Sequence, residues 1–196
     1  MYNFPKIDVF LESWNRTDLY KVDYTIVKSE LEKNGRVCSD VATLSGPILA
    51  KNDENFLATL EVGIVDLIRI MINDYGLITI GSCEWHKHLS TTHNISKRFA
   101  KVLWRNKDEY KKNYPILKQI ADDINKWFKN VKIAFFDFEE EFPNWQIYHL
   151  CFMVFIPFDS DVDIYFSEVD EISESYNRAL TQAKNEISVP PDHQNL

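Results

Sequence analysis

The residues best suited to chemistry lie close together, between positions 83 and 88 of the 196-residue chain. Cys83, Glu84, His86 and His88 follow directly after a short apolar run and Gly81. A thiol beside a carboxylate and an imidazole can act as a nucleophile with its base, which makes Cys83, Glu84 and His86 the candidate catalytic residues. A structural cysteine next to exposed histidines is the alternative interpretation, and it is the more common arrangement of these residue types.

The same segment is a weak candidate for a metal site. Extended backbone points successive side chains to opposite faces, so His86 and His88 could share an ion that Cys83 would not reach. Zinc sites usually combine two matched pairs of ligands, and no second pair accompanies Cys83-x-x-His86. We therefore predict no metal, with His86 and His88 as the weak exception. The chain has no Walker loop, Gly-rich dinucleotide fingerprint or Gly-x-Ser-x-Gly elbow, so we predict no cofactor either.

Three other groups of polar residues have ordinary structural explanations. They are His149 with Cys151, the carboxylates Asp137, Glu139 and Glu141, and the run Asp159, Asp161 and Asp163. A calcium loop counted from Asp159 would need Gly and Glu at positions where this chain has Ile164 and Asp170. We interpret His149 and Cys151 as buried strand residues and the three carboxylates from Asp137 as a solvated strand face. The run from Asp159 is interpreted as the acidic start of a helix. His149 and Cys151 could join Cys83 in one site only if their strands were neighbours.

Charge divides the chain into two unequal parts. The formal net charge is −8, from 22 Lys+Arg and 30 Asp+Glu, which argues against binding nucleic acid through the whole surface. Residues 86–112 nevertheless carry eight basic residues against two acidic ones, so this stretch has a net charge of +6 and the rest −14. We call these basic residues the basic strip: Lys87, Lys97, Arg98, Lys101, Arg105, Lys107, Lys111 and Lys112.

The basic strip could hold a phosphate-bearing ligand or nucleic acid. Arg98, Lys101 and Arg105 are the candidate anion-binding residues, because they follow the Cys83 segment directly. Aromatic side chains between them, Trp85, Phe99 and Trp104, could stack on bases. The alternative is an ordinary solvated surface, on which lysines also protect a strand edge from aggregation.

The elements that position these residues predict an α+β fold. Apolar residues recur at helical spacing from Asp53 to Gly76, from Pro115 to Phe128 and from Ser167 to Ile187. Gly76 supplies a left-handed helix stop, and Ser167 followed by Asp170 resembles a capping box. Pro115 is expected near the start of the second helix, with Trp127 on its buried face.

Shorter apolar runs predict strands at 77–80, 99–105, 131–140 and 146–156. Strands joined by short connections favour antiparallel pairing, with helices packed on one face. We expect a two-layer α+β sandwich with a mainly antiparallel sheet of about four strands, plus an N-terminal helical segment. The strand at 131–138 is expected in the centre of the sheet and the one at 99–105 at an edge.

The chain is expected to fold around one core. Residues 1–52 are predicted as an N-terminal helical cover of that core, 53–187 as the α+β domain and 188–196 as a polar tail. No apolar run approaches the about 20 residues of a membrane span, and the N-terminus lacks a signal-peptide pattern. Three scattered cysteines suit a reducing compartment. These features predict a cytoplasmic protein without membrane contact.

Three short segments carry a resemblance to known proteins. They are Leu60-Glu61-Val62-Gly63-Ile64, Ile72-Asn73-Asp74-Tyr75-Gly76 and Thr79-Ile80-Gly81-Ser82-Cys83-Glu84-Trp85-His86. Together they resemble a pattern in uncharacterised bacterial and phage proteins: a Gly-Ile helix, Asn-x-x-Gly, then Thr-x-x-Ser-Cys-Glu-Gly-His, with Trp85 in place of that last Gly. The arrangement is also distantly similar to the Ser-Ser-Cys-Ser-Gly-Arg motif of the tRNA wybutosine-synthesising methyltransferases. The resemblance implies an intracellular accessory protein of bacterial or mobile-element type.

Two functions are consistent with these observations. The first is a non-enzymatic, cytoplasmic accessory subunit that binds a protein partner within a larger bacterial or mobile-element system. The acidic helix at 167–187 would be one contact surface and the basic strip another. The alternative is an enzyme or sensor that acts on a nucleotide or nucleic acid, with the Ser82–His86 segment as its reactive centre and the basic strip as its phosphate holder.

Overall fold

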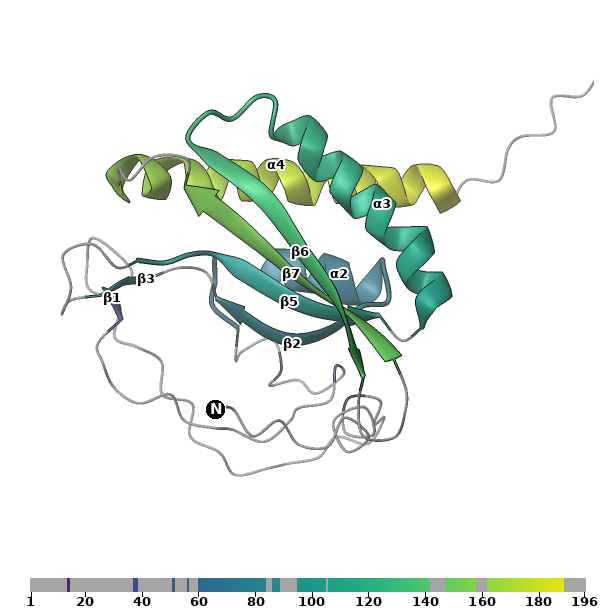
Figure 1. The fold of residues 1–196 in the computed structure, drawn as a ribbon. Coiled ribbons are helices and arrows are strands. Elements are labelled where there is room, and N and C mark those ends of the chain that lie inside the picture. The colour runs from purple at the N-terminus through teal and green to yellow at the C-terminus, as the bar shows by residue number, and fades with distance from the viewer. Residues whose placement is uncertain are drawn as a thin grey trace, which may run out of the picture.

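The computed structural model describes Trp14, Lys51, Phe56 and residues 37–38, 60–83, 86–88, 95–104, 106–141, 147–157 and 162–188. Its main sheet is antiparallel and has four strands in the order β2-β5-β7-β6. The strands are β2 (Ile78–Cys83), β5 (Phe99–Trp104), β7 (Ile147–Pro157) and β6 (Val131–Glu141). Helices α2 (Val65–Asn73), α3 (Lys107–Ile124) and α4 (Val162–Ser188) pack against this sheet, and α4 contacts both other helices (Figure 1). The predicted α+β class is confirmed.

A second, smaller sheet lies beside the main one. It consists of β1 (Val37–Cys38), β3 (His86–His88) and β4 (Ile95–Ser96), with β1 parallel to β3. The predicted helical cover of residues 1–52 lies mostly outside the described residues, as do Asp159, Asp161 and the tail from residue 189. Trp14 is an exception, because its side chain is buried and packs edge-on against Phe56, with the ring centroids 5.3 Å apart.

The core lies between the sheet and the helices α3 and α4. Val102 and Cys151, which are register partners on β5 and β7, are both fully buried on the face that these helices cover. Helix α4 meets this face with an apolar stripe at spacings of three and four residues: Val169, Ile172, Tyr176 and Leu180, all with no exposed surface. The stripe is the one that the sequence predicts.

The strand order corrects the predicted centre and edge of the sheet. β5 lies between β2 and β7, whereas β6 is the terminal strand, so the expected edge is internal and the expected centre is an edge. Helix α3 covers part of that edge through Asn125, whose side-chain amide donates to the Ile133 carbonyl (2.9 Å) and accepts from the Ile133 N–H (2.8 Å). At Ile133 the amide therefore makes the two backbone hydrogen bonds that a neighbouring strand would make, which protects this part of the sheet edge.

All three helices begin at other residues than the sequence predicts. Helix α2 starts at Val65 rather than Asp53, after a turn in which the Ile64 N–H bonds to the Glu61 carbonyl at 3.1 Å. Helix α4 starts at Val162, so Ser167 lies inside it and bonds to the Ile164 carbonyl instead of capping. Helix α3 starts at Lys107, which leaves Pro115 in its interior. Its N-cap is Asn106, which accepts a hydrogen bond from the Glu109 N–H at 2.9 Å.

Gly76 has the predicted left-handed conformation, with φ of +67°. Replacing it with alanine is expected to lower the free energy of unfolding by about 1 kcal/mol, because a Cβ disfavours this conformation. An added Cβ would meet no atom within 4 Å, so the cost is conformational rather than steric. Urea unfolding measures the difference.

The matched control is Gly81→Ala, at a glycine without positive φ where an added Cβ would meet only the Lys101 Cδ, at 3.9 Å. This variant should lose no stability, because alanine is preferred to glycine inside a strand. Equal losses at both glycines would contradict the conformational explanation.

Candidate functional site

The Cys83 segment spans the end of one sheet and the start of another. Cys83 ends β2, where it pairs with Phe99 of β5 and is partly exposed. The backbone of His86 and His88 belongs to β3, whose neighbours are β1 and β4. Glu84 and Trp85 lie outside the described residues, so convergence of the thiol, carboxylate and imidazole stays a prediction. Among the described residues, no three His, Cys, Asp or Glu side chains are grouped so that they could hold a metal ion.

Cys83 and Cys151 do not share a site. β5 separates their strands, and Cys151 lies on the face covered by α3 and α4, whereas the alternation along β2 and β5 puts Cys83 on the other face. Cys83 is partly exposed, whereas Cys151 is buried. Burial, and then the charge of Asp137, raise the pKa of the Cys151 thiol to about 12. A thiol this buried and this weakly acidic is a poor nucleophile, in agreement with the structural interpretation of this cysteine.

Arg98 is buried, contrary to the expectation of an exposed phosphate ligand. Its side chain is only 1% exposed, and the guanidinium donates to Asp170 Oδ1 at 2.5 Å and to the Val169 carbonyl at 3.2 Å. The Arg98 backbone N–H donates to the Tyr165 hydroxyl at 2.9 Å. These contacts tie the start of β5 to α4, so Arg98 is a structural residue in this fold.

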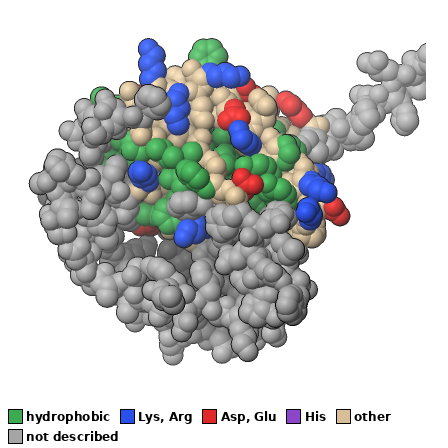
Figure 2. Space-filling model, in the orientation of Figure 1, with side chains coloured by type: hydrophobic (Ala, Val, Ile, Leu, Met, Phe, Trp, Pro, Cys, Tyr) green, Lys and Arg blue, Asp and Glu red, His purple; other side chains and the backbone are tan. Residues whose placement is uncertain are grey.

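The described lysines of the basic strip lie on different surfaces. Lys101 is exposed on the sheet face opposite Val102, whereas Lys107, Lys111 and Lys112 are exposed on α3. Arg105 lies outside the described residues. Figure 2 shows lysine and arginine side chains scattered over the visible described surface rather than gathered in a band.

Asp137 is exposed, as predicted for a solvated strand face, and it also has a specific environment. Its carboxylate accepts hydrogen bonds from the hydroxyls of Tyr110 (2.6 Å) and Tyr114 (2.9 Å), which lie one turn apart on α3. Burial and the neighbouring Asp137 carboxylate raise the pKa of Tyr114. The arrangement fastens α3 to β6 and keeps the Tyr114 phenol protonated.

The most exposed large aromatic residue of the described chain is Trp127, which the sequence places on a buried face. Its side chain is 85% exposed. The helix ends at Ile124 with Asn125 as its C-cap, and the Trp127 N–H bonds back to the Ile124 carbonyl at 2.9 Å. This turn takes the indole off the apolar stripe. The asparagine is the one sequence signal that could have indicated the early helix end.

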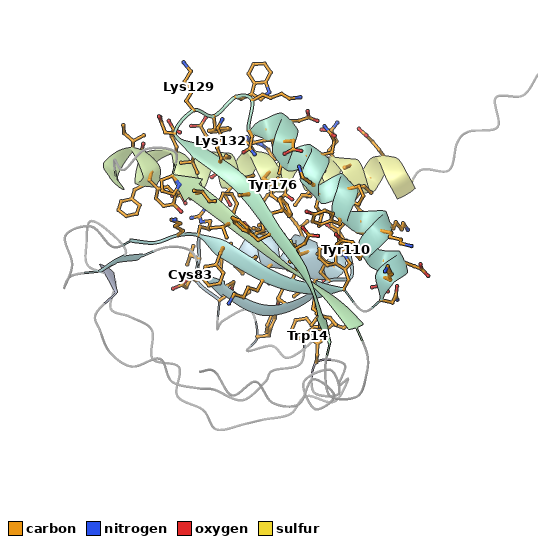
Figure 3. The ribbon with its side chains drawn as sticks, viewed as in Figure 1. Trp14, Cys83, Tyr110, Lys129, Lys132 and Tyr176 are labelled. Atoms are coloured by element: carbon orange, nitrogen blue, oxygen red, sulfur yellow. The ribbon has the colours of Figure 1, made fainter. Side chains whose placement is uncertain are left out.

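Trp127 forms one side of a groove between the end of α3 and the first half of α4. We call it the α3–α4 groove; it has a volume of about 480 Å³, and its lining includes Ile124, Trp127, Phe128, Lys129, Glu168 and Glu171. Figure 3 shows Lys129 and Lys132 together where α3 leads into β6, with Cys83 on the opposite side of the sheet. The groove is therefore remote from the predicted catalytic segment.

The two sides of the α3–α4 groove differ in chemistry. The α3 side carries the apolar side chains of Ile124, Trp127 and Phe128 and, at its rim, the exposed Lys129. The turn at its end is held in place by Lys132, which donates to the carbonyls of Asn125 and Phe128. The α4 side is acidic. Glu168 accepts a hydrogen bond from the Asn130 side-chain amide at 2.5 Å, and Glu171 is exposed.

A second groove, between α2 and α4, is larger but less distinctive. Its volume is about 590 Å³, and its charged lining residues are Asp66, Arg69, Glu174 and Arg178. The two signs balance, and Arg69 already pairs with Asp66 at 3.2 Å. No aromatic side chain lines it. It therefore offers neither a charge preference nor an apolar anchor.

Comparison with known proteins finds no matching protein family, curated protein or solved structure. The resemblance to bacterial and phage proteins and to the wybutosine-synthesising methyltransferases thus stays a prediction. No helix among the described residues is long and apolar enough to cross a membrane.

Proposed function

We propose that this chain is a non-enzymatic, cytoplasmic accessory subunit that binds a protein partner through the α3–α4 groove. The observation that carries the proposal is the 85% exposure of Trp127 beside the partly buried Phe128. Covering such an indole removes up to about 170 Å² of apolar surface from water, which is worth about 4 kcal/mol. Tryptophan is also among the residues that most often dominate binding energy at protein interfaces.

The framework around Trp127 favours a binding role over a fluctuating loop end. The turn that follows α3 is fixed by backbone hydrogen bonds and by the Lys132 ammonium. The Asn125 side-chain amide also fixes it, by bonding to Ile133 of β6. A rigid exposed anchor loses little conformational entropy when it is covered, which increases affinity. The alternative of a nucleotide- or nucleic-acid-acting protein has less support, because Arg98 is engaged in the core and the exposed lysines are dispersed.

Site-specific photo-crosslinking tests the proposal. A benzophenone amino acid at position 129, on the rim of the groove, is expected to crosslink to a partner in cells that make the protein. The same group at position 62 is the control, because Val62 is 80% exposed but does not line the groove. Trp127→Ala should reduce the position-129 crosslink at least tenfold, since interface tryptophans typically contribute 2 kcal/mol or more, roughly 30-fold in affinity.

Two results would overturn the proposal. One is crosslinking that is equal at positions 62 and 129, or that does not change with Trp127→Ala, because the groove would then not be the contact surface. The other is a crosslinked product with twice the mass of the chain. That product would identify the occupant as a second copy and the surface as a dimer interface.

A further inference from the structure

We propose that the partner segment held in the α3–α4 groove is a basic amphipathic helix; this inference rests on the proposed function and names the chemistry of the partner. The groove lies between two helices, and an amphipathic helix is the usual occupant of such a site, with its apolar face turned inward. Ile124, Trp127 and Phe128 supply the apolar contact on the α3 side.

The acidic side of the groove determines the charge of the partner. Glu168 and Glu171 line the groove three residues apart on α4, which is a span of about 4.5 Å along the helix axis. Lysines or arginines on two successive turns of a partner helix match that span. Glu171 is exposed and Glu168 is partly exposed, and no described cation forms an ion pair with either of them. Their charges are therefore available to a partner.

The rest of α4 strengthens the preference for a cationic partner. The helix carries six carboxylates against two cations, Arg178 and Lys184, so its field attracts positive charge along its length. The indole ring of Trp127 adds a second attraction, because a lysine or arginine can lie over its face. Lys126, on the same turn as Trp127, is held by Asp123 at 2.5 Å and so opposes an incoming cation less than a free lysine would.

A pair of synthetic peptides tests this inference. Both are 18-residue helices with the same leucine stripe; one carries lysines on the flank that would face α4, and the other carries glutamates at those positions. Fluorescence polarisation at 0.1 M salt is expected to show at least tenfold tighter binding of the lysine peptide. Glu171→Lys should weaken that binding about tenfold.

Glu186→Lys is the matched control. It makes the same charge change at an exposed carboxylate of α4, about four turns away from Glu171 and outside the groove. Equal weakening by Glu171→Lys and Glu186→Lys would overturn the inference, because attraction to the net charge would then explain the binding. Equal binding of both peptides, lost with Trp127→Ala, would overturn the basic chemistry and leave the docking role intact. If neither peptide binds but the Trp127-dependent crosslink at position 129 is retained, the inferred basic helix is likewise overturned and the docking role of the groove stands.

Discussion

Replacing Asp170 with alanine is expected to lower the free energy of unfolding by about 3 kcal/mol. The substitution leaves the Arg98 guanidinium, whose side chain is 1% exposed, without the carboxylate that lies 2.5 Å from it. Removing one partner of a buried ion pair costs several kcal/mol, and the estimate is at the lower end of the usual range because the Asp170 side chain is 48% exposed. Urea unfolding at pH 7 measures the effect.

The double variant Arg98→Met/Asp170→Ala separates the charge from the packing. Methionine keeps a long apolar chain beside Phe155 and removes the positive charge. In the unaltered protein the guanidinium carbon of Arg98 lies 6.0 Å from the centroid of the Phe155 ring. The double variant should therefore be more stable than Asp170→Ala alone. A double variant as unstable as the sum of both single variants would contradict this explanation.

The exposed ion pair between Asp66 and Arg69 provides the control. Its side chains are 69% and 51% exposed, so Asp66→Ala removes a pair of the same type from solvent. Such pairs contribute at most about 1 kcal/mol, and usually less. A loss at Asp66 equal to that at Asp170 would mean that burial of Arg98 does not determine the cost.

The local patterns of the sequence predicted the helices and strands well, because each element is defined by its own residues. The stripe Val169, Ile172, Tyr176 and Leu180 has helical period over its full length, and all four residues are buried in the structure. Gly76 likewise indicates its own conformation, since only glycine takes a positive φ without cost. Periodicity and special backbone geometry are properties of neighbouring residues, so they can be recognised in one sequence.

The sheet order and the role of Arg98 could not be predicted in this way. The first half of β6 is apolar, yet β6 ends the sheet, and Asn125, just after α3, hydrogen-bonds the outward-facing groups of Ile133. Arg98 looks like one of eight basic residues in a strip, and its burial depends on Asp170, which lies 72 residues away. Both outcomes are decided by contacts between distant segments.

The candidate binding surface was missed for a different reason. Trp127 continues the apolar spacing of Ile116, Ile120 and Ile124, which predicts burial as long as the helix continues. The helix ends at Ile124, and a turn of three residues changes the direction of the side chain. A position near a helix end is where a small error in the boundary reverses a prediction of burial.

The protein is expected to lose about 4 kcal/mol of stability between pH 8 and pH 11 through two buried groups alone. Burial raises the pKa of Cys151 from 9.0 to about 12 and that of Tyr165 from 10.0 to about 12. Because both pKa values are raised, the folded protein keeps protons that the unfolded chain releases. The stabilisation is therefore complete below pH 9 and is lost as the pH rises towards 12.

Removing one of these groups should flatten the pH dependence while lowering stability at neutral pH. Cys151→Ala costs about 1 kcal/mol at pH 7 for the lost packing, but it should remove about 3 kcal/mol of the loss between pH 8 and pH 11. The control is Val102→Ala, because Val102 is the register partner of Cys151, is equally buried and does not titrate. Urea unfolding of the unaltered protein and of the Cys151→Ala and Val102→Ala variants, at pH 8 and at pH 11, makes the comparison. If the Cys151→Ala and Val102→Ala proteins show the same slope, then titration of the buried thiol is not what destabilises the fold in alkali.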